Sequence, residues 1–171
     1  IDANNGWILS YYGKIFHTTN GGTDWLLQYQ LPEGQYYSIK FINNLKGWIS
    51  GNLTPWNESV IYKTTDGGKN WQVSDNGLPQ TKFTGRIGLS FSRSNPNVVY
   101  AYVDNHSPKR EPKAGELDPY GRPIQVIPFG VQVYRSDDKG DNWRKVSTED
   151  DKLERFAGTY GWVFGQIRVD P

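Results

Sequence analysis

The feature that most constrains this chain is an eight-residue segment that occurs three times. Residues 18–25, 64–71 and 136–143 all fit the pattern Ser/Thr-x-Asp/Asn-x-Gly-x-x-Trp. Alternating apolar and polar residues precede each copy, as in residues 14–17. Period-two patterning of this kind is typical of a strand that leads into a turn. A recurring segment indicates that one supersecondary unit is repeated along the chain.

The spacing of the copies gives the size of the unit. Trp25 and Trp71, which close the first two copies, are 46 residues apart, whereas Trp71 and Trp143 are 72 residues apart. A period in the forties is typical of a four-stranded propeller blade. We interpret the longer spacing as an insert at residues 105–129, which holds five of the 10 prolines and is expected to be a long loop.

Four strands per unit, in the order A-B-C-D, account for the rest of the chain. Blade 1 supplies strands B to D within residues 6–30, blade 2 spans 36–74, and blade 3 spans 86–147. Residues 164–171 are expected to form the first strand of a further blade. The predicted fold is all-β: a β-propeller of four-stranded antiparallel blades, with residues 1–171 as a single partial domain of about three blades.

Three blades are too few to close a ring, because propellers close with about 4–8. The chain opens on Ile1 and contains no Met, which favours a processed product or an excised piece of a longer propeller. The alternative is self-association. The predicted strand at 164–171 would complement strands B to D at the N-terminus of a second copy, so that a head-to-tail pair completes a ring.

The residue types of the repeat suit a tight turn. A Ser/Thr hydroxyl and an Asp/Asn side chain bond turn amides, a Gly supplies positive φ, and the indole buries apolar area. We therefore interpret the repeat as structural, and a calcium site is disfavoured because no copy has the bidentate Glu of a calcium loop. No metal or cofactor is expected. The structural residues are Thr18, Asn20, Gly22, Trp25, Thr64, Asp66, Gly68, Trp71, Ser136, Asp138, Gly140 and Trp143.

On these residues the chain resembles the BNR, or Asp-box, repeat superfamily of β-propellers. The first two units, in which a Gly-Trp strand precedes the repeat, resemble the photosystem II assembly factor-like members. The third unit and the tail, with Gly-Arg-Ile-Gly-Leu at 85–89 and Ile-Arg-Val-Asp-Pro at 167–171, are more similar to secreted BNR-repeat glycosyl hydrolase-like proteins. Sialidases, xyloglucan-active hydrolases and sortilin-type receptors share the repeat. It is a scaffold in all of them, so the resemblance predicts the fold and leaves the activity open.

The topology places the longest connections on one face. In a propeller the B–C and D–A connections leave one face, and the A–B and C–D connections leave the other. The long connections at 52–59, 75–85, 105–129 and 148–161 are all of the first kind. We term this side the long-loop face and the opposite side, which carries the repeat turns, the box face. Partners are expected on the long-loop face, because loops on a rigid scaffold concentrate binding residues.

Four residues are candidates for ligand binding there. Trp56 lies in a polar loop and suits stacking on a sugar ring, or alternatively anchors the loop on the next blade. Arg86 opens strand A and suits a carboxylate or sugar hydroxyl, or an ordinary ion pair. Tyr36 and Trp162 lie near strand A of their blades, where they line the axial channel or belong to the core.

A glycoside hydrolase needs two carboxylates roughly 5–10 Å apart across the scissile bond. The long-loop face offers too many acids for the sequence to identify a catalytic pair. A sialidase is disfavoured, because the expected Phe/Tyr-Arg-Ile-Pro motif is absent. The candidate acids are Glu58, Asp75, Asp104, Glu111, Glu116, Asp118 and residues 149–151.

Composition excludes other classes. Basic and acidic residues number 19 and 18, with a net charge of +1, so nucleic-acid binding is not expected. No apolar run has the length of a membrane helix, and there is no Cys to form disulfides. The sequence thus predicts a non-catalytic carbohydrate- or protein-binding or assembly module of an extracytoplasmic protein, secreted or periplasmic. The alternative is a fragment of a glycoside hydrolase, xyloglucanase-like rather than sialidase-like, that acts on polysaccharide.

Overall fold

The computed structural model describes residues 2–55, 58–92, 94–118, 120–148, 153 and 167–169. This part of the chain contains eleven strands and one short 3-10 helix. In chain order the elements are β1 (Gly6–Leu9), β2 (Lys14–Thr18), β3 (Leu26–Gln30), β4 (Gly34–Phe41), β5 (Gly47–Leu53), β6 (Glu58–Thr64), β7 (Gln72–Val73), η1 (Thr81–Phe83), β8 (Thr84–Phe91), β9 (Val99–Arg110), β10 (Ile127–Ser136) and β11 (Arg144–Lys145).

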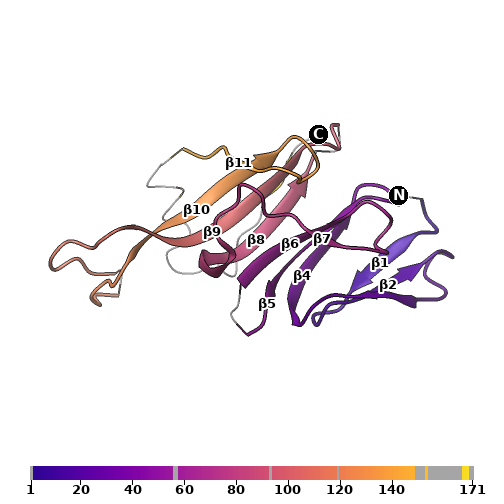
Figure 1. Ribbon diagram of the computed structural model, residues 1–171, viewed down its shortest axis with the longest axis horizontal. Coiled ribbons are helices and arrows are strands. Elements are labelled where there is room, and N and C mark those ends of the chain that lie inside the picture. Colours follow the sequence, from indigo (N-terminus) through magenta and orange to yellow (C-terminus); the bar gives the residue numbers. More distant parts are fainter. Residues whose placement is uncertain are drawn as a thin grey trace.

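The strands form three antiparallel sheets that lie side by side as successive blades (Figure 1). Blade 1 has the order β1-β2-β3, blade 2 the order β4-β5-β6-β7, and blade 3 the order β8-β9-β10-β11. Each strand pairs with its neighbour in the chain, as expected for meandering blades. The predicted all-β fold of antiparallel blades is confirmed.

Side chains alternate between the two faces of blade 2 and so fill two cores. Ile49, Val60 and Tyr62 point toward blade 1, whereas Trp48 and Ile61 point toward blade 3. Period-two alternation requires this division, because successive residues of a strand face opposite sides of the sheet. Blade 2 is therefore a central layer with no free face, and it fixes the positions of both neighbours.

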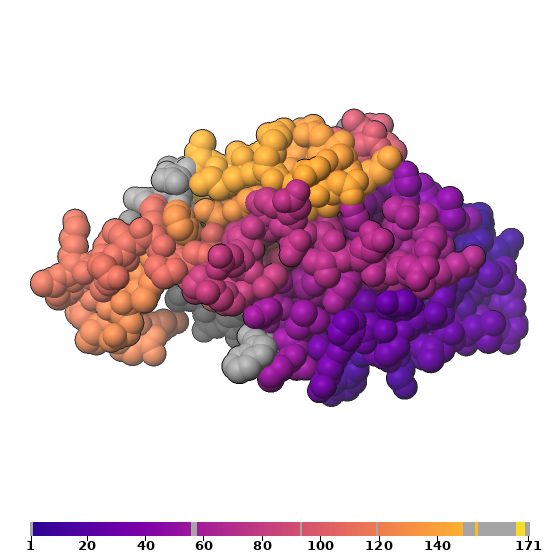
Figure 2. All heavy atoms as spheres, viewed as in Figure 1, coloured from indigo at the N-terminus to yellow at the C-terminus, as the bar shows by residue number. Residues whose placement is uncertain are grey.

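The insert at 105–129 is not a loop as predicted. β9 continues to Arg110 and β10 begins at Ile127, so that the two ends of the insert pair as a β-ribbon. This hairpin leaves the body of blade 3 and stands clear of it (Figures 1 and 2). The high proline content misled the prediction. Each ribbon strand beyond blade 3 has one unpaired edge, where a residue without an N–H costs no ladder hydrogen bond, and Pro108 lies opposite Pro128 at a register shift.

The predicted strand at 164–171 lies mostly outside the described residues. Residues 167–169 adopt no regular secondary structure, and the amide of Val169 donates a hydrogen bond to Ser90 Oγ of β8 at 3.0 Å. Among the described residues, β1 pairs with β2 alone. The extent of the domain, and the completion of a ring by a second copy, stay predictions.

Candidate functional site

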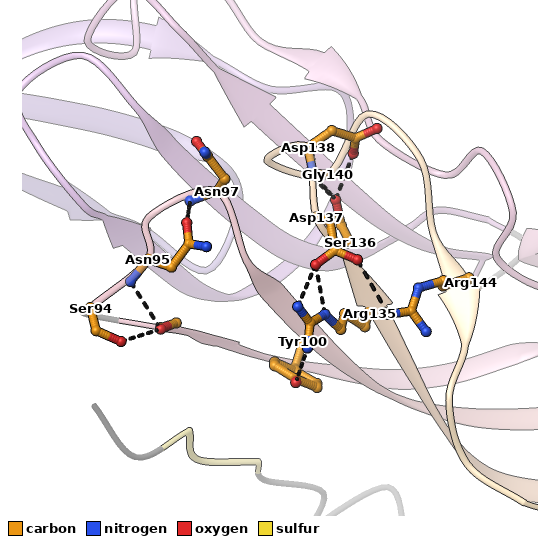
Figure 3. A network of polar contacts seen from close by, with 11 residues as sticks. Ser94, Asn95, Asn97, Tyr100, Arg135, Ser136, Asp137, Asp138, Gly140 and Arg144 are labelled. Atoms are coloured by element: carbon orange, nitrogen blue, oxygen red, sulfur yellow. Dashed lines mark hydrogen bonds and ion pairs between the residues drawn. The ribbon is translucent and has the colours of Figure 1, made fainter.

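The repeat turns on the box face use their polar groups internally. In the second copy, Thr64 Oγ1 donates to Asp66 Oδ1 at 2.8 Å and accepts from the Gly68 amide at 3.0 Å. Asp66 Oδ1 also accepts from the amide of Asn70 at 3.0 Å. The third copy has the same bonds around Ser136 (Figure 3). Little capacity is left in these turns for a ligand.

Charged groups beside the third turn are neutralised locally (Figure 3). Arg135 donates to Asp137 through Nε at 2.8 Å and to the Tyr100 hydroxyl at 2.9 Å. Arg144 Nη2 lies 3.3 Å from the other oxygen of Asp137. These hydrogen bonds, that from Arg135 first, lower the pKa of Asp137. The polar and charged groups at the third turn are thus bonded largely to one another.

The Gly-Trp strands connect each blade to the next. Trp7 Nε1 of β1 donates to the carbonyl of Gly67 in the second turn at 2.9 Å, and Trp48 Nε1 of β5 donates to the carbonyl of Lys139 in the third at 3.1 Å. The backbone at Gly140, with φ of +86°, passes close to Trp48. Sequence reasoning noted these Trp residues without finding this role.

Two β-bulges on the long-loop face turn side chains out of the sheet. In blade 2, Tyr36 pairs with Gly51 and Ser38 with Ser50, so that Tyr37 is the extra residue. In blade 3, the register shifts between Thr84 and Ile87, where Arg86 lies. Bulges redirect side chains and are frequent beside functional sites. The Arg86 guanidinium stacks over the Tyr37 ring at 4.8 Å from its centroid.

Blade 1 adds two tyrosines to this pair. Tyr11 and Tyr12 lie in the β1–β2 connection, and the Tyr36 amide donates to the Tyr11 carbonyl at 2.9 Å. The Tyr11 ring lies edge-on to that of Tyr37 at 6.2 Å. The Tyr12 ring lies edge-on to that of Tyr11 at 5.1 Å, and all three tyrosines are exposed, whereas Arg86 is half-buried. We define Tyr11, Tyr12, Tyr37 and Arg86 as the rim patch.

A buried carboxylate lies next to the rim patch. Asp104 Oδ2 is 2.9 Å from His106 Nε2, and this hydrogen bond raises the pKa of His106. A Cβ on Gly85 would stand 2.9 Å from the same oxygen, so the absence of a side chain there admits the carboxylate. Within the described residues, Asp104 Oδ1 has no hydrogen-bond partner. Sequence reasoning did not identify this pair, whose members are two residues apart in β9.

The predicted ligand-binding residues fall in different places. Arg86 belongs to the rim patch. Of the two alternatives for Tyr36, the structure has the core: its side chain is only 3% exposed and its hydroxyl donates to the Pro32 carbonyl, whereas Tyr37 is 37% exposed. Burial raises the pKa of Tyr36. Trp56 and Trp162 lie outside the described residues.

Three of the candidate catalytic acids, Glu58, Glu116 and Asp118, are bonded to neighbouring side chains. Glu58 accepts a hydrogen bond from Thr81 Oγ1 at 3.0 Å. On the hairpin, Glu116 and Asp118 each lie 2.7 Å from an arginine. No group of three His, Asp or Glu side chains that would suit a metal occurs in the described part of the chain. Among the same residues, no helix has the length and apolar character needed to cross a membrane. Residues 149–151 lie outside the description.

Comparisons with known proteins give relatives of two kinds. No family model matches the chain. Photosystem II assembly lipoprotein Ycf48 of Synechococcus sp. (strain CC9902) is 32% identical over 76 residues, which cover 43% of this chain and 21% of that protein. The solved structure of YCF48 bound to D1 peptide matches with a TM-score of 0.50 and 21% identity, over 84% of this chain and 38% of that one.

The second kind is enzymatic. The GH74 xyloglucanase from Xanthomonas campestris matches with a TM-score of 0.54 and 12% identity, over 85% of this chain and 19% of the enzyme. The GH74 enzyme of Niastella koreensis matches with a TM-score of 0.50 and 17% identity, over 83% and 20%. At these identities the likeness shows the fold alone. The chain spans 38% or less of the length of each of these relatives.

Proposed function

We propose that this chain, which is similar to Ycf48 over 76 residues and shares the propeller fold of the GH74 xyloglucanase, is a non-catalytic module that binds an extended segment of a partner protein. One observation carries the proposal. Bulges in β4 and β8 bring Tyr37 and Arg86 into stacking contact on the long-loop face, with Tyr11 and Tyr12 beside them.

The chemistry of the rim patch suits a polypeptide with acidic and apolar side chains. Tyrosine rings give large contact areas at a small entropic cost and accept hydrogen bonds at their hydroxyls. A guanidinium stacked on a ring retains its charge in a partly dry site, where attraction to a carboxylate is stronger than in water. The D1 peptide in the YCF48 structure supports a peptide as the class of ligand.

The repeat turns of the box face are a less suitable place for the peptide. Its acids and hydroxyls are bonded to their own turn, as at Asp66 and Asp138, and its arginines are paired with Asp137. Exposed aromatic side chains that gather around a cation mark an interaction surface more often than scattered ones do. The rim patch has that character, and the repeat turns do not.

Binding to an array of short peptides of graded acidity tests the proposal. We expect Arg86→Ala to weaken binding by about tenfold to a hundredfold, because central arginines dominate interface energies, and Arg86→Lys to recover only part of it. Arg144→Ala, a matched change of an exposed arginine on the box face, should leave binding unchanged. Equal affinities for the wild type, Arg86→Ala and Tyr37→Ala would contradict the proposal.

Carbohydrate is the second candidate ligand, favoured by the exposed tyrosines, which also stack on sugar rings, and by the xyloglucanase fold likeness. Affinity electrophoresis in soluble xyloglucan, with an assay of reducing-sugar release, separates the possibilities. Retardation without release would make carbohydrate the ligand of a non-catalytic module. If reducing sugar is released and either Glu58→Gln or Asp104→Asn abolishes that release, the non-catalytic proposal is overturned.

An extracytoplasmic location is also part of the proposal. Its support is the Ycf48 relative, which is named a lipoprotein. Fractionation of cells that produce the protein, with immunodetection of this chain, tests the location. We expect the chain outside the cytoplasm, and its recovery only with cytoplasmic markers would contradict this part.

A further inference from the structure

The hairpin at 106–129, termed the arm, is ordered by its own contacts. Arg110 binds both carboxylate oxygens of Glu116, at 2.9 and 2.7 Å, and the Lys113 amide donates to the same carboxylate at 2.8 Å. Bidentate pairs of this kind fix geometry as well as adding energy. The hydrogen bond from Arg110, followed by that from the Lys113 amide, lowers the pKa of Glu116 to about 2. This pair therefore persists at all ordinary pH values.

The outermost turn is closed in the same way. Asp118 accepts hydrogen bonds from the amides of Tyr120 and Arg122 at 2.8 and 2.9 Å, and from the guanidinium of Arg122 at 2.8 Å. Leu117 and Pro123 form a β-bridge across the turn. The tip thus holds a defined shape although it projects away from the blades (Figure 2).

This ordered tip presents apolar side chains to solvent. Leu117, Tyr120 and Val126 are all exposed. In both ion pairs the base is more exposed than the acid, 44% against 27% for Arg110–Glu116 and 72% against 23% for Arg122–Asp118. The outer surface of the tip is therefore apolar with a basic margin. Such a surface gains free energy when a partner covers it.

The opposite end of the molecule carries a complementary groove. A hollow of about 550 Å³ lies between the repeat turns of blades 1 and 2, far from the arm in Figure 1. Leu26, Leu27 and Leu45 line it and are exposed. We term this hollow the box groove. An adjoining hollow shares Leu45 and adds Asp2.

The box groove carries excess negative charge. The two hollows together hold the carboxylates of Asp2, Asp24 and Asp66 against the single ammonium of Lys69. Hydrogen bonds, from Asn44 first, lower the pKa of Asp2, and burial and then the charge of Lys69 lower the pKa of His17. These shifts keep the Asp2 carboxylate charged and leave His17 uncharged near neutral pH. The groove is apolar with an acidic margin, the complement of the tip.

The boundary between two neighbouring blades is termed a seam. The groove is open because the seam between blades 1 and 2 lacks an ion pair that is present in the seam between blades 2 and 3. Between blades 2 and 3, Lys63 of β6 forms an ion pair with Asp141 of the third turn. The equivalent positions between blades 1 and 2 hold His17 and Lys69, two basic residues. Opposite charges draw the rims together in one seam, whereas the other has no such attraction.

We propose that the tip of the arm of one copy of this chain docks into the box groove of a second copy. The arm and the box groove lie at opposite ends of the molecule, so the tip of one copy cannot reach the groove of the same copy. The contact is heterologous, and repeated docking builds an open chain or a ring. Each docking removes exposed leucines of the groove and exposed apolar residues of the tip from water, while Arg122 and Lys113 meet the acidic margin.

Sedimentation of the 171-residue chain over a range of concentrations tests this contact. We expect the average mass to rise with concentration. Leu117→Asp on the tip and Leu45→Asp in the groove should each weaken association by about tenfold or more. Val73→Asp, an equally exposed apolar position on β7 outside both surfaces, is the matched control and should associate like the wild type. Arg86→Ala in the rim patch should do the same, which separates this contact from the proposed function.

Mixing the two variants is the decisive measurement. Leu117→Asp keeps an intact groove and Leu45→Asp keeps an intact tip, so an equimolar mixture should form 1:1 dimers and nothing larger. Recovery of the dimer also shows that both variants are folded. A monomeric wild type at all concentrations, a mixture that stays monomeric, or association insensitive to either variant would overturn the proposal. The last result is the one expected if strand exchange at β1 joins the copies.

Discussion

The two faces of the blades differ in how their polar groups are used. On the box face, three turns repeat one hydrogen-bonded pattern, and each Asp or Asn is bonded within its own turn. On the long-loop face, every connection is different, and bulges turn Tyr37 and Arg86 outward. The visible repeat is therefore a device for stability, and the proposed peptide site lies where the blades depart from one another.

The largest expected effect is loss of stability at a box-face seam. Trp48 is fully buried and donates to the carbonyl of Lys139, so Trp48→Ala should lower the free energy of unfolding by about 3–5 kcal/mol. Trp25 of the first turn is 37% exposed, whereas its counterpart Trp143 is 5% exposed. Trp25→Ala should therefore lower the free energy of unfolding by clearly less than Trp48→Ala does. Denaturant unfolding measures both. Equal losses would show that the seams do not set stability.

Next in size is the backbone of the repeat turn. Gly140 has a φ of +86°, and a Cβ there would lie 2.9 Å from Ser74 Oγ and 3.0 Å from Trp48 Nε1. We expect Gly140→Ala to destabilise the fold by about 1–3 kcal/mol. Gly115 on the arm has a similar φ of +77° with nothing within 4 Å of its Cβ position, so Gly115→Ala isolates the cost of the dihedral angle. The comparison fails if the two variants unfold alike.

The two histidines give a smaller effect that separates the faces. Asp104 raises the pKa of His106 on the long-loop face, whereas burial and Lys69 lower that of His17 on the box face. In an NMR titration His106 should therefore titrate above His17, and Asp104→Asn should lower the pKa of His106 alone. Because the folded pKa of His106 is raised, its stabilising contribution is complete below about pH 6.5 and is lost as pH rises through the folded value. The reverse order of titration would contradict the assigned partners.

The smallest effect concerns surface ion pairs. Arg144 lies 3.3 Å from Asp137 and both side chains are well exposed. Exposed pairs contribute about 0–1 kcal/mol, so Arg144→Ala should change the free energy of unfolding very little. A large loss in denaturant unfolding would mean that the network in Figure 3 stabilises the third turn more than its exposure implies.

Most of the fold could be predicted because its signals are local. The strand-turn pattern around residues 14–25 and its recurrence fixed the blades without knowledge of long-range contacts. The roles of Trp7 and Trp48 could not be predicted, since their partners are 60 and 91 residues away in the sequence. The comparisons add that the overall fold is shared with propellers of both kinds of relative.

The candidate site was harder to predict, because bulges break the alternation on which such predictions depend. Regular alternation does not predict from the sequence that Tyr37 rather than Tyr36 is exposed. The extra residue of the bulge shifts every side chain beyond it to the other face of the sheet. Arg86 was found because it opens strand A, and its stacking on a tyrosine of the preceding blade was not. Prolines concealed the arm, which pairs as a ribbon in spite of Pro108 and Pro128.

The most direct test of the central claim is to locate a bound peptide on the protein. NMR spectra of the chain, titrated with the tightest peptide of the array, would report which amides and side chains respond. The account predicts shifts at Tyr11, Tyr12, Tyr37 and Arg86, with the turns at 18–25, 64–71 and 136–143 unchanged. Shifts confined to those turns, with none at the rim patch, would contradict it.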